Sequence, residues 1–90
     1  MPFVYILRCS DGSLYTGAAV DLAKRLREHQ SGKASRYTRS RLPVDLAWSA
    51  EVETWGDALR EERRIKRLRR LKKEELMAGG GGRRDDAQAP

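Results

Sequence analysis

The stretch "SLYTGAAVDLAKRLREHQSG", residues Ser13–Gly32, decides the fold. It starts with a run of strand-forming residues, Leu14–Gly17, and continues into a segment whose apolar side chains recur at helical spacing. Asp21 is a suitable helix N-cap, although Lys24 stands where the Glu of a capping box would be. Gly32 is placed to end the helix. The stretch therefore predicts a strand that leads directly into a helix.

A second strand is predicted just upstream of this stretch. Phe3–Leu7 is rich in aromatic and β-branched residues, and Ser10–Ser13 is dense in turn formers. The two strands should therefore pair as an antiparallel hairpin. A hairpin centred on this turn is expected to place Tyr5 and Tyr15 close to opposite one another.

The downstream half predicts one more strand and one or two more helices. The segment 33–43 is expected to be a loop rich in basic residues, and Val44–Val52 a third strand. A helical stripe follows from about Asp57 to Leu71, and 72–77 could add a short helical turn. The sequence thus predicts an α+β domain with a three-stranded, largely antiparallel sheet flanked by helices, in the order β-β-α-β-α(-α).

The domain is expected to span residues 1–78. Ninety residues suffice for one small domain. The segment 79–90 is rich in Gly and charge and poor in apolar residues, so we expect it to be a disordered tail.

Composition favours a polyanionic partner. The chain has 19 Lys and Arg residues against 13 Asp and Glu, a formal net charge of +6. Neutralising phosphates with Lys and Arg releases condensed counterions and so favours binding to nucleic acid. The alternative is a basic surface that only keeps a small protein soluble.

Cysteine usage and hydropathy favour a cytoplasmic protein without membrane contact. The single cysteine, Cys9, can form no intrachain disulfide and has no partner for a zinc site, so it is expected to be a buried thiol. No run approaches the roughly 18 apolar residues of a membrane span, and no signal-peptide pattern is present.

A few polar residues are candidates for chemistry. Gly17, at the end of its strand, could let a phosphate approach the backbone. Arg25 and His29 lie four residues apart on one helix face, and Glu62 is a carboxylate on an apolar helical stripe. These residues and the two strand tyrosines, Tyr5 and Tyr15, each have a structural alternative. The tyrosines could be packing residues, Arg25 a solvated side chain, His29 a hydrogen-bonded histidine and Glu62 a salt-bridged glutamate.

The order of these pieces resembles the GIY-YIG nuclease domain, in particular its small stand-alone bacterial members. Val4–Ile6 matches the first motif of the family and Tyr15–Gly17 the second. Arg25 matches the catalytic arginine, His29 a histidine that several members use, and Glu62 the metal-binding glutamate. The resemblance extends from about residue 3 to residue 71.

The resemblance implies a mechanism for phosphodiester hydrolysis. One divalent ion, Mg²⁺ or Mn²⁺, would be held by Glu62, and Arg25 would bind phosphate oxygens. Tyr5 would act as the general base once its proton affinity is lowered by Arg25 and the metal. Tyr15 and His29 would orient the water or relay the proton.

Basic side chains are expected to contact the nucleic-acid backbone. The segment Arg60–Lys73 carries nine Lys and Arg residues, which should repel one another unless an anion lies nearby. We predict that it binds DNA together with the loop, by backbone and shape rather than base sequence. The predicted contact residues in these two segments are Arg36, Tyr37, Arg39 and Lys66.

The sequence therefore predicts a metal-dependent DNA endonuclease in DNA repair, recombination or DNA turnover. The alternative is a catalytically weak or inactive nucleic-acid-binding module that acts with a partner protein. A third hypothesis is a domain that acts only in complex with a targeting protein partner, because ninety residues hold no separate targeting domain.

Overall fold

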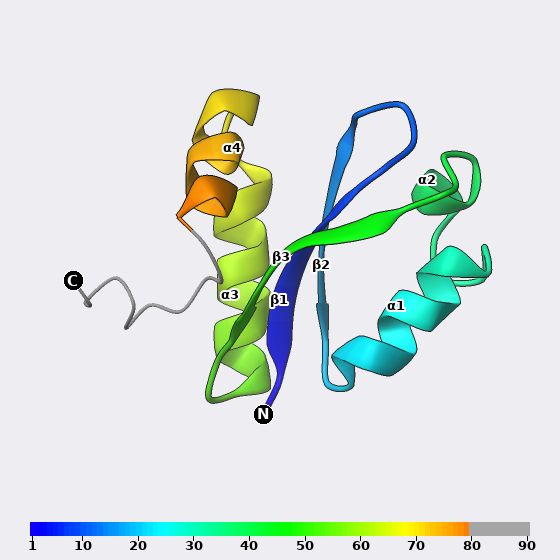
Figure 1. The fold of residues 1–90 in the computed structure, drawn as a ribbon. Coiled ribbons are helices and arrows are strands. Elements are labelled where there is room, and N and C mark those ends of the chain that lie inside the picture. Colours follow the sequence, from blue (N-terminus) through cyan, green and yellow to red (C-terminus); the bar gives the residue numbers. More distant parts are fainter. Residues whose placement is uncertain (80–90) are drawn as a thin grey trace.

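The computed structural model describes residues 1–79. A three-stranded antiparallel sheet has β1 at its centre, in the order β2-β1-β3, and helices flank it (Figure 1). The elements in chain order are β1 (Phe3–Arg8), β2 (Leu14–Ala19), α1 (Leu22–Gln30), α2 (Arg36–Arg39), β3 (Asp45–Glu51), α3 (Trp55–Lys66) and α4 (Arg70–Ala78). The predicted α+β class and element order are confirmed.

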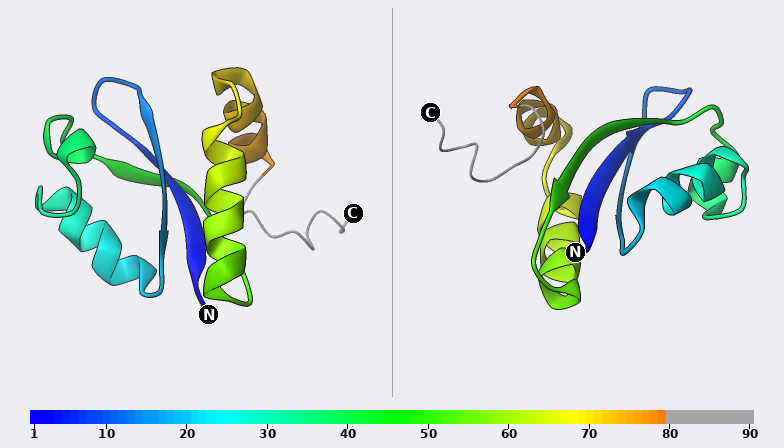
Figure 2. Two further views of the ribbon diagram at one scale, coloured as in Figure 1. Left: turned by 180° about the vertical axis from the view of Figure 1, so that it is seen from behind. Right: turned by 60° about the horizontal axis from the view of Figure 1, so that its bottom comes forward.

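The sheet separates two hydrophobic cores. Helices α1 and α2 lie on one side of it, and α3 and α4 lie on the other (Figure 2). Because side chains alternate along a strand, Tyr5 and Leu7 of β1 belong to the core under α1, whereas Val4 and Ile6 pack with Ile65 of α3. The central strand thus contributes to both cores and holds the two helical layers in a fixed relation.

The hairpin register places Tyr5 and Tyr15 close to one another but not as a direct pair. Five residues, 9–13, connect β1 to β2, and Tyr5 pairs with Gly17 while Tyr15 pairs with Leu7. Tyr15 therefore lies two residues along β2 from the partner of Tyr5. Since an offset of two residues preserves the side of the sheet, the tyrosines share a face as diagonal neighbours.

The predicted limits of α1 are confirmed by its caps. Asp21 accepts a hydrogen bond from the Lys24 backbone N–H at 3.0 Å. At the other end, Gly32 adopts a φ of +81°, a left-handed conformation in which glycine has no steric penalty. Between the caps, Leu22 and Leu26 pack against the core.

The downstream helices differ in extent from those predicted, and one short helix is additional. The predicted loop 33–43 contains the one-turn helix α2, whose N-cap Ser35 accepts a hydrogen bond from the Tyr37 N–H. The predicted helix from Asp57 to Leu71 is two helices, because α3 starts after the Thr54 cap and ends at Lys66. No Gly or Pro marks this break, and α4 folds back over the second core.

Other predictions for the chain have different outcomes. Cys9 is 5% exposed, which confirms a buried thiol. Among the helices described in residues 1–79, none is long and apolar enough to cross a membrane. Apart from Gly79, the predicted tail lies outside the described residues.

Candidate active site

The predicted catalytic residues line one small hollow. It has a volume of about 220 Å³ and lies between α1 and α3, beside β2. Four elements contribute the polar side chains that face it: Tyr5 from β1, Tyr15 from β2, Arg25 and His29 from α1, and Glu62 from α3. Residues that are 57 positions apart in the chain (Tyr5 and Glu62) thus meet at one site.

A phenol and an imidazole form the buried floor of this hollow. The Tyr5 hydroxyl lies 2.8 Å from His29 Nε2, and the two residues are 2% and 1% exposed. The Tyr15 ring meets the His29 ring edge-on, with centroids 5.1 Å apart. Because water has little access, the hydrogen bond between Tyr5 and His29 has no solvent competitor.

Gly17 makes this arrangement possible. A Cβ atom at this position would lie 2.5 Å from the Tyr5 hydroxyl and 2.7 Å from Cζ of the same ring. We expected the glycine to let a phosphate approach the backbone, but the space in front of it is filled by the Tyr5 phenol. Its absent side chain therefore serves to seat the tyrosine.

The electrostatics of the hollow keep Tyr5 protonated. Burial raises the pKa of the Tyr5 phenol well above its usual value, and Tyr15 raises it further. Arg25 lowers this pKa, as predicted, but its effect is smaller than that of burial and is opposed by Glu62 and Glu28. In the protein without a bound ion, Tyr5 is thus a hydrogen-bond donor.

The pKa of His29 is shifted in the opposite direction from that of Tyr5. Burial lowers the pKa of its imidazole, the positive charge of Arg25 lowers it further, and Glu28 partly opposes them. Since an ordinary histidine titrates near about 6.5, His29 is neutral at pH 7 and one ring nitrogen is free to accept a proton.

Arg25 lies at the mouth of the hollow with its guanidinium half-exposed. Nη1 is 3.3 Å from Glu28 Oε1, an ion pair within one turn of α1. Such an exposed pair contributes little to stability, so the guanidinium can exchange this carboxylate for a phosphate.

Glu62 reaches the hollow from the opposite helix. Its side chain is 19% exposed, and Oε2 is 2.9 Å from Lys66 Nζ, so the carboxylate is paired rather than isolated. Lys66 was predicted to contact DNA, and here it neutralises Glu62. Within residues 1–79 no group of three or more His, Cys, Asp and Glu side chains could hold a metal. A single carboxylate fits Mg²⁺, which usually keeps several waters and takes one or two protein carboxylates.

Two residues at the site were missed by the sequence analysis. Thr38 is fully buried, and its Oγ1 is 2.9 Å from His29 Nδ1. Trp55, the first residue of α3, lines the hollow and is 44% exposed. Neither had a recognisable signal, because a threonine in a segment rich in arginine and serine is typical of a surface loop, and Trp55 adjoins a helix cap.

The predicted contact residues of the loop lie on α2, which packs against α1. The Tyr37 ring is 5.8 Å from the Tyr15 ring, and the Arg41 guanidinium lies 3.8 Å above the Tyr37 ring centre. Arg36 and Arg39 are exposed, and among the ion pairs of residues 1–79 neither takes part. The loop therefore presents two available cations near the site.

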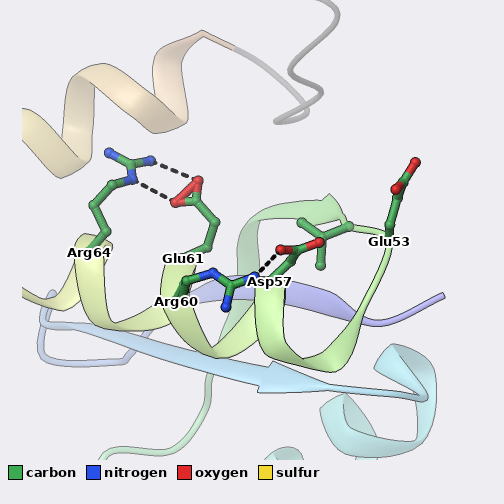
Figure 3. A pocket seen from close by; sticks show the side chains of 6 residues that line it. Glu53, Asp57, Arg60, Glu61 and Arg64 are labelled. Atoms are coloured by element: carbon green, nitrogen blue, oxygen red, sulfur yellow. Dashed lines mark hydrogen bonds and ion pairs between the residues drawn. The ribbon is translucent and has the colours of Figure 1, made fainter.

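Five of the nine cations of the Arg60–Lys73 segment pair with carboxylates of their own helix. Figure 3 shows a second hollow, about 490 Å³ in volume, on α3, where Asp57 pairs with Arg60 and Glu61 with Arg64 at 2.6 Å. Lys66, Arg70 and Lys72 also have carboxylate partners. Among the ion pairs of residues 1–79, four cations of the segment take no part: Arg63, Arg67, Arg69 and Lys73. The expected repulsion along the segment is thus relieved only in part by intervening acidic side chains.

Comparison with known proteins assigns the family. A family model described as the GIY-YIG catalytic domain matches residues 1–75. This chain belongs to the GIY-YIG family. The resemblance predicted from the order of the motifs is thus confirmed.

This GIY-YIG chain is similar to small proteins of bacteria and archaea. It is 49% identical over 72 residues to a UPF0213 protein of Bacillus velezensis, which covers 80% of this chain and 73% of the relative. It is 43% identical over 74 residues to a UPF0213 protein of Halobacterium salinarum, which covers 82% and 96%. The solution NMR structure of the UPF0213 protein BH0048 from Bacillus halodurans superposes with a TM-score of 0.59 at 43% identity, covering 91% of this chain and 88% of that one.

Proposed function

We propose that this GIY-YIG chain is a divalent-metal-dependent endonuclease that hydrolyses phosphodiester bonds in DNA. The observation that carries the proposal is the convergence of the Tyr5–His29 pair, Arg25 and Glu62 on one hollow. A proton acceptor, a permanent cation and a carboxylate are what activation of water and neutralisation of a phosphate require.

Tyr5 and His29 would act as a proton relay. The attacking water gives a proton to the Tyr5 oxygen while the phenol proton passes to His29 Nε2, 2.8 Å away. The imidazole ends as imidazolium, and no free phenolate has to form. This relay agrees with the raised pKa of Tyr5 and the lowered pKa of His29.

Arg25 would hold the scissile phosphate. Its planar guanidinium matches two phosphoryl oxygens and can donate two parallel hydrogen bonds to them. The neighbouring Glu28 keeps the side chain extended along α1 until the phosphate replaces it.

Glu62 would hold one divalent ion, Mg²⁺ or Mn²⁺, after Lys66 has released the carboxylate. When bound, such an ion polarises the phosphate and stabilises the leaving oxygen.

The substrate would be held mainly through its backbone. Arg36 and Arg39, exposed beside the site, would bind phosphates, and Tyr37 adds an aromatic surface between them. A role in DNA repair, recombination or DNA turnover, with a partner protein for targeting, stays a prediction from the sequence.

A cleavage assay tests the proposal. Single-stranded, duplex, flapped and branched DNA would be incubated with the protein and Mg²⁺, Mn²⁺ or EDTA. Glu62→Gln should abolish metal-dependent cleavage and preserve the fold. Glu61→Gln is the matched control, since Glu61 is the adjacent residue, pairs with Arg64 and lies at the other hollow.

Two results would contradict the proposal. Cleavage by Glu62→Gln at the wild-type rate would show that the assigned metal ligand is wrong. Tight DNA binding by the wild type without cleavage of any substrate would favour the binding module instead.

A further inference from the structure

We propose that Thr38 is a positioning residue, which fixes His29 in the tautomer that can accept the Tyr5 proton. The inference rests on the proposed function for its catalytic consequence, but the tautomer itself follows from hydrogen-bond geometry. It concerns three side chains from β1, α1 and α2 that are each 2% exposed or less.

The Thr38 hydroxyl lies between two possible partners. Oγ1 is 3.3 Å from the Ser35 carbonyl oxygen and 2.9 Å from His29 Nδ1. A carbonyl can only accept, and a hydroxyl has a single proton. Thr38 therefore donates to Ser35 and accepts from His29, which requires the proton of the imidazole to be on Nδ1.

The position of the imidazole proton also decides the hydrogen bond between His29 and Tyr5. A neutral imidazole has one N–H, so a proton on Nδ1 leaves Nε2 with a free lone pair. Nε2 is the atom 2.8 Å from the Tyr5 hydroxyl, and it then accepts the phenol proton. The Tyr5 hydroxyl thus donates to His29 Nε2. The His29 Nδ1–H donates to the Thr38 hydroxyl, which in turn donates to the Ser35 carbonyl.

The opposite tautomer would break this chain. A proton on Nε2 would point at Tyr5, the phenol proton would lose its acceptor, and Thr38 would have to turn from the Ser35 carbonyl to donate to Nδ1. Buried polar groups without partners are unfavourable, and with Thr38 fully buried no water replaces them. An imidazole in that state could not take the proton that the relay sends to Nε2.

The fold holds Thr38 in a single turn of helix. Ser35 caps α2 through its side chain, which accepts the Tyr37 N–H at 3.1 Å, while its carbonyl also accepts the Arg39 N–H at 2.9 Å. The β-branched Thr38 side chain has few rotamers in a helix. Its hydroxyl is thus fixed by α2 before any substrate is bound.

The first test measures the tautomer directly, without metal or DNA. His29 is the only histidine of the chain, so long-range ¹H–¹⁵N correlations of uniformly labelled protein at pH 7.5 report one imidazole. In the wild type and in Thr38→Ser, Nδ1 should have the chemical shift of a protonated nitrogen. In Thr38→Val, which has no acceptor at this position, the proton should move to Nε2.

The second test measures the consequence for the reaction. Thr38→Val should lower kcat at least about tenfold with little change in KM, and Thr38→Ser should restore kcat to within about threefold. Circular dichroism and metal-free DNA affinity of both variants show whether the fold is retained.

The outcomes separate this inference from the proposed function. An Nε2–H tautomer in the wild type, or an unchanged tautomer in folded Thr38→Val, would overturn it. A shifted tautomer with an unchanged kcat would also overturn the positioning role. Absence of cleavage by the wild type would count against the proposed function alone, because the NMR result still decides the assignment of Thr38.

Discussion

The hydroxyl of Tyr5 is hydrogen-bonded to Nε2 of His29 at 2.8 Å, although the two residues are 24 positions apart. The bond joins the central strand of the sheet to the helix that covers it. Because both side chains are buried, changes to either one should alter the chemistry and the stability together.

Tyr5→Phe should lower the single-turnover cleavage rate by about 10²–10⁴-fold, the range typical of general acid–base catalysis. Loss of the phenol donor leaves Nε2 unpaired, so a decrease of about 1 kcal/mol in the free energy of unfolding should accompany it. Rates would be measured at saturating metal and several pH values, with Tyr15→Phe as the matched control, for which we expect a smaller loss. Full activity of Tyr5→Phe with an inactive Tyr15→Phe would reverse the two roles.

Gly17→Ala should displace the Tyr5 ring, because its Cβ would lie 2.5 Å from the hydroxyl. Overpacking of this kind costs about 1–3 kcal/mol, which thermal or urea unfolding would detect, and cleavage should fall as well. Gly56→Ala is the matched control, because the nearest side-chain atom to its Cβ would be an Arg60 nitrogen at an ordinary 3.6 Å. Equal stability of Gly17→Ala and wild type would refute the close packing of Tyr5 on Gly17.

Stability should fall when the pH is lowered from about 7 to 5. The pKa of His29 is lower in the folded protein than its unfolded value near about 6.5, so the unfolded chain binds more protons in this range and acid favours unfolding. The loss should level off below the folded pKa. The other ionisable side chains that line the hollow with His29 are Tyr5, Tyr15, Arg25 and Glu62.

Urea unfolding at each pH checks this expectation. In His29→Gln the part of the slope between pH 7 and 5 that belongs to the imidazole should disappear. The carboxyl groups of Asp11, Asp57 and Glu74, whose pKa values are lowered by their hydrogen bonds, add a separate loss at more acidic pH. An identical pH profile in wild type and His29→Gln would show that His29 is not buried as a neutral group.

Replacement of Arg36 and Arg39 by Ala should weaken DNA binding and flatten its dependence on salt. Each duplex phosphate contact that is lost should reduce the slope of log K against log salt by about 0.9. Arg60→Ala is the control, since Arg60 is paired with Asp57 on α3. A larger effect from Arg60→Ala would favour the α3 surface as the DNA contact.

Local signals in the sequence predicted much of the fold. The cap at Asp21 and the glycine at Gly32 act through their own backbone neighbours, so both ends of α1 could be read directly. The break after Lys66 could not, because no Gly or Pro marks it and α4 gains its position by packing on the second core. The hairpin register depended on where the turn is centred, which composition leaves open.

The candidate site could be predicted as far as its residues match the family motifs in their order along the sequence. The resemblance brought Tyr5, His29 and Glu62 to one site, and the structure places them there. Thr38 was not predictable, because its only link to the site is the contact with the imidazole of His29, nine positions earlier in the chain. The salt-bridged alternative for Glu62 was predictable because basic residues surround it in the sequence, and the structure shows this pair with Lys66.

Helix α2 has an exposed face and a buried face. Within its single turn Arg36 and Arg39 are exposed, whereas the hydroxyl of Thr38 is buried and contacts the imidazole of His29. Because one capped turn of four residues carries both faces, a displacement of its backbone would move the exposed cations and the buried hydroxyl together. Contact with a polyanion at the surface and orientation of the imidazole in the interior would therefore depend on the same four residues.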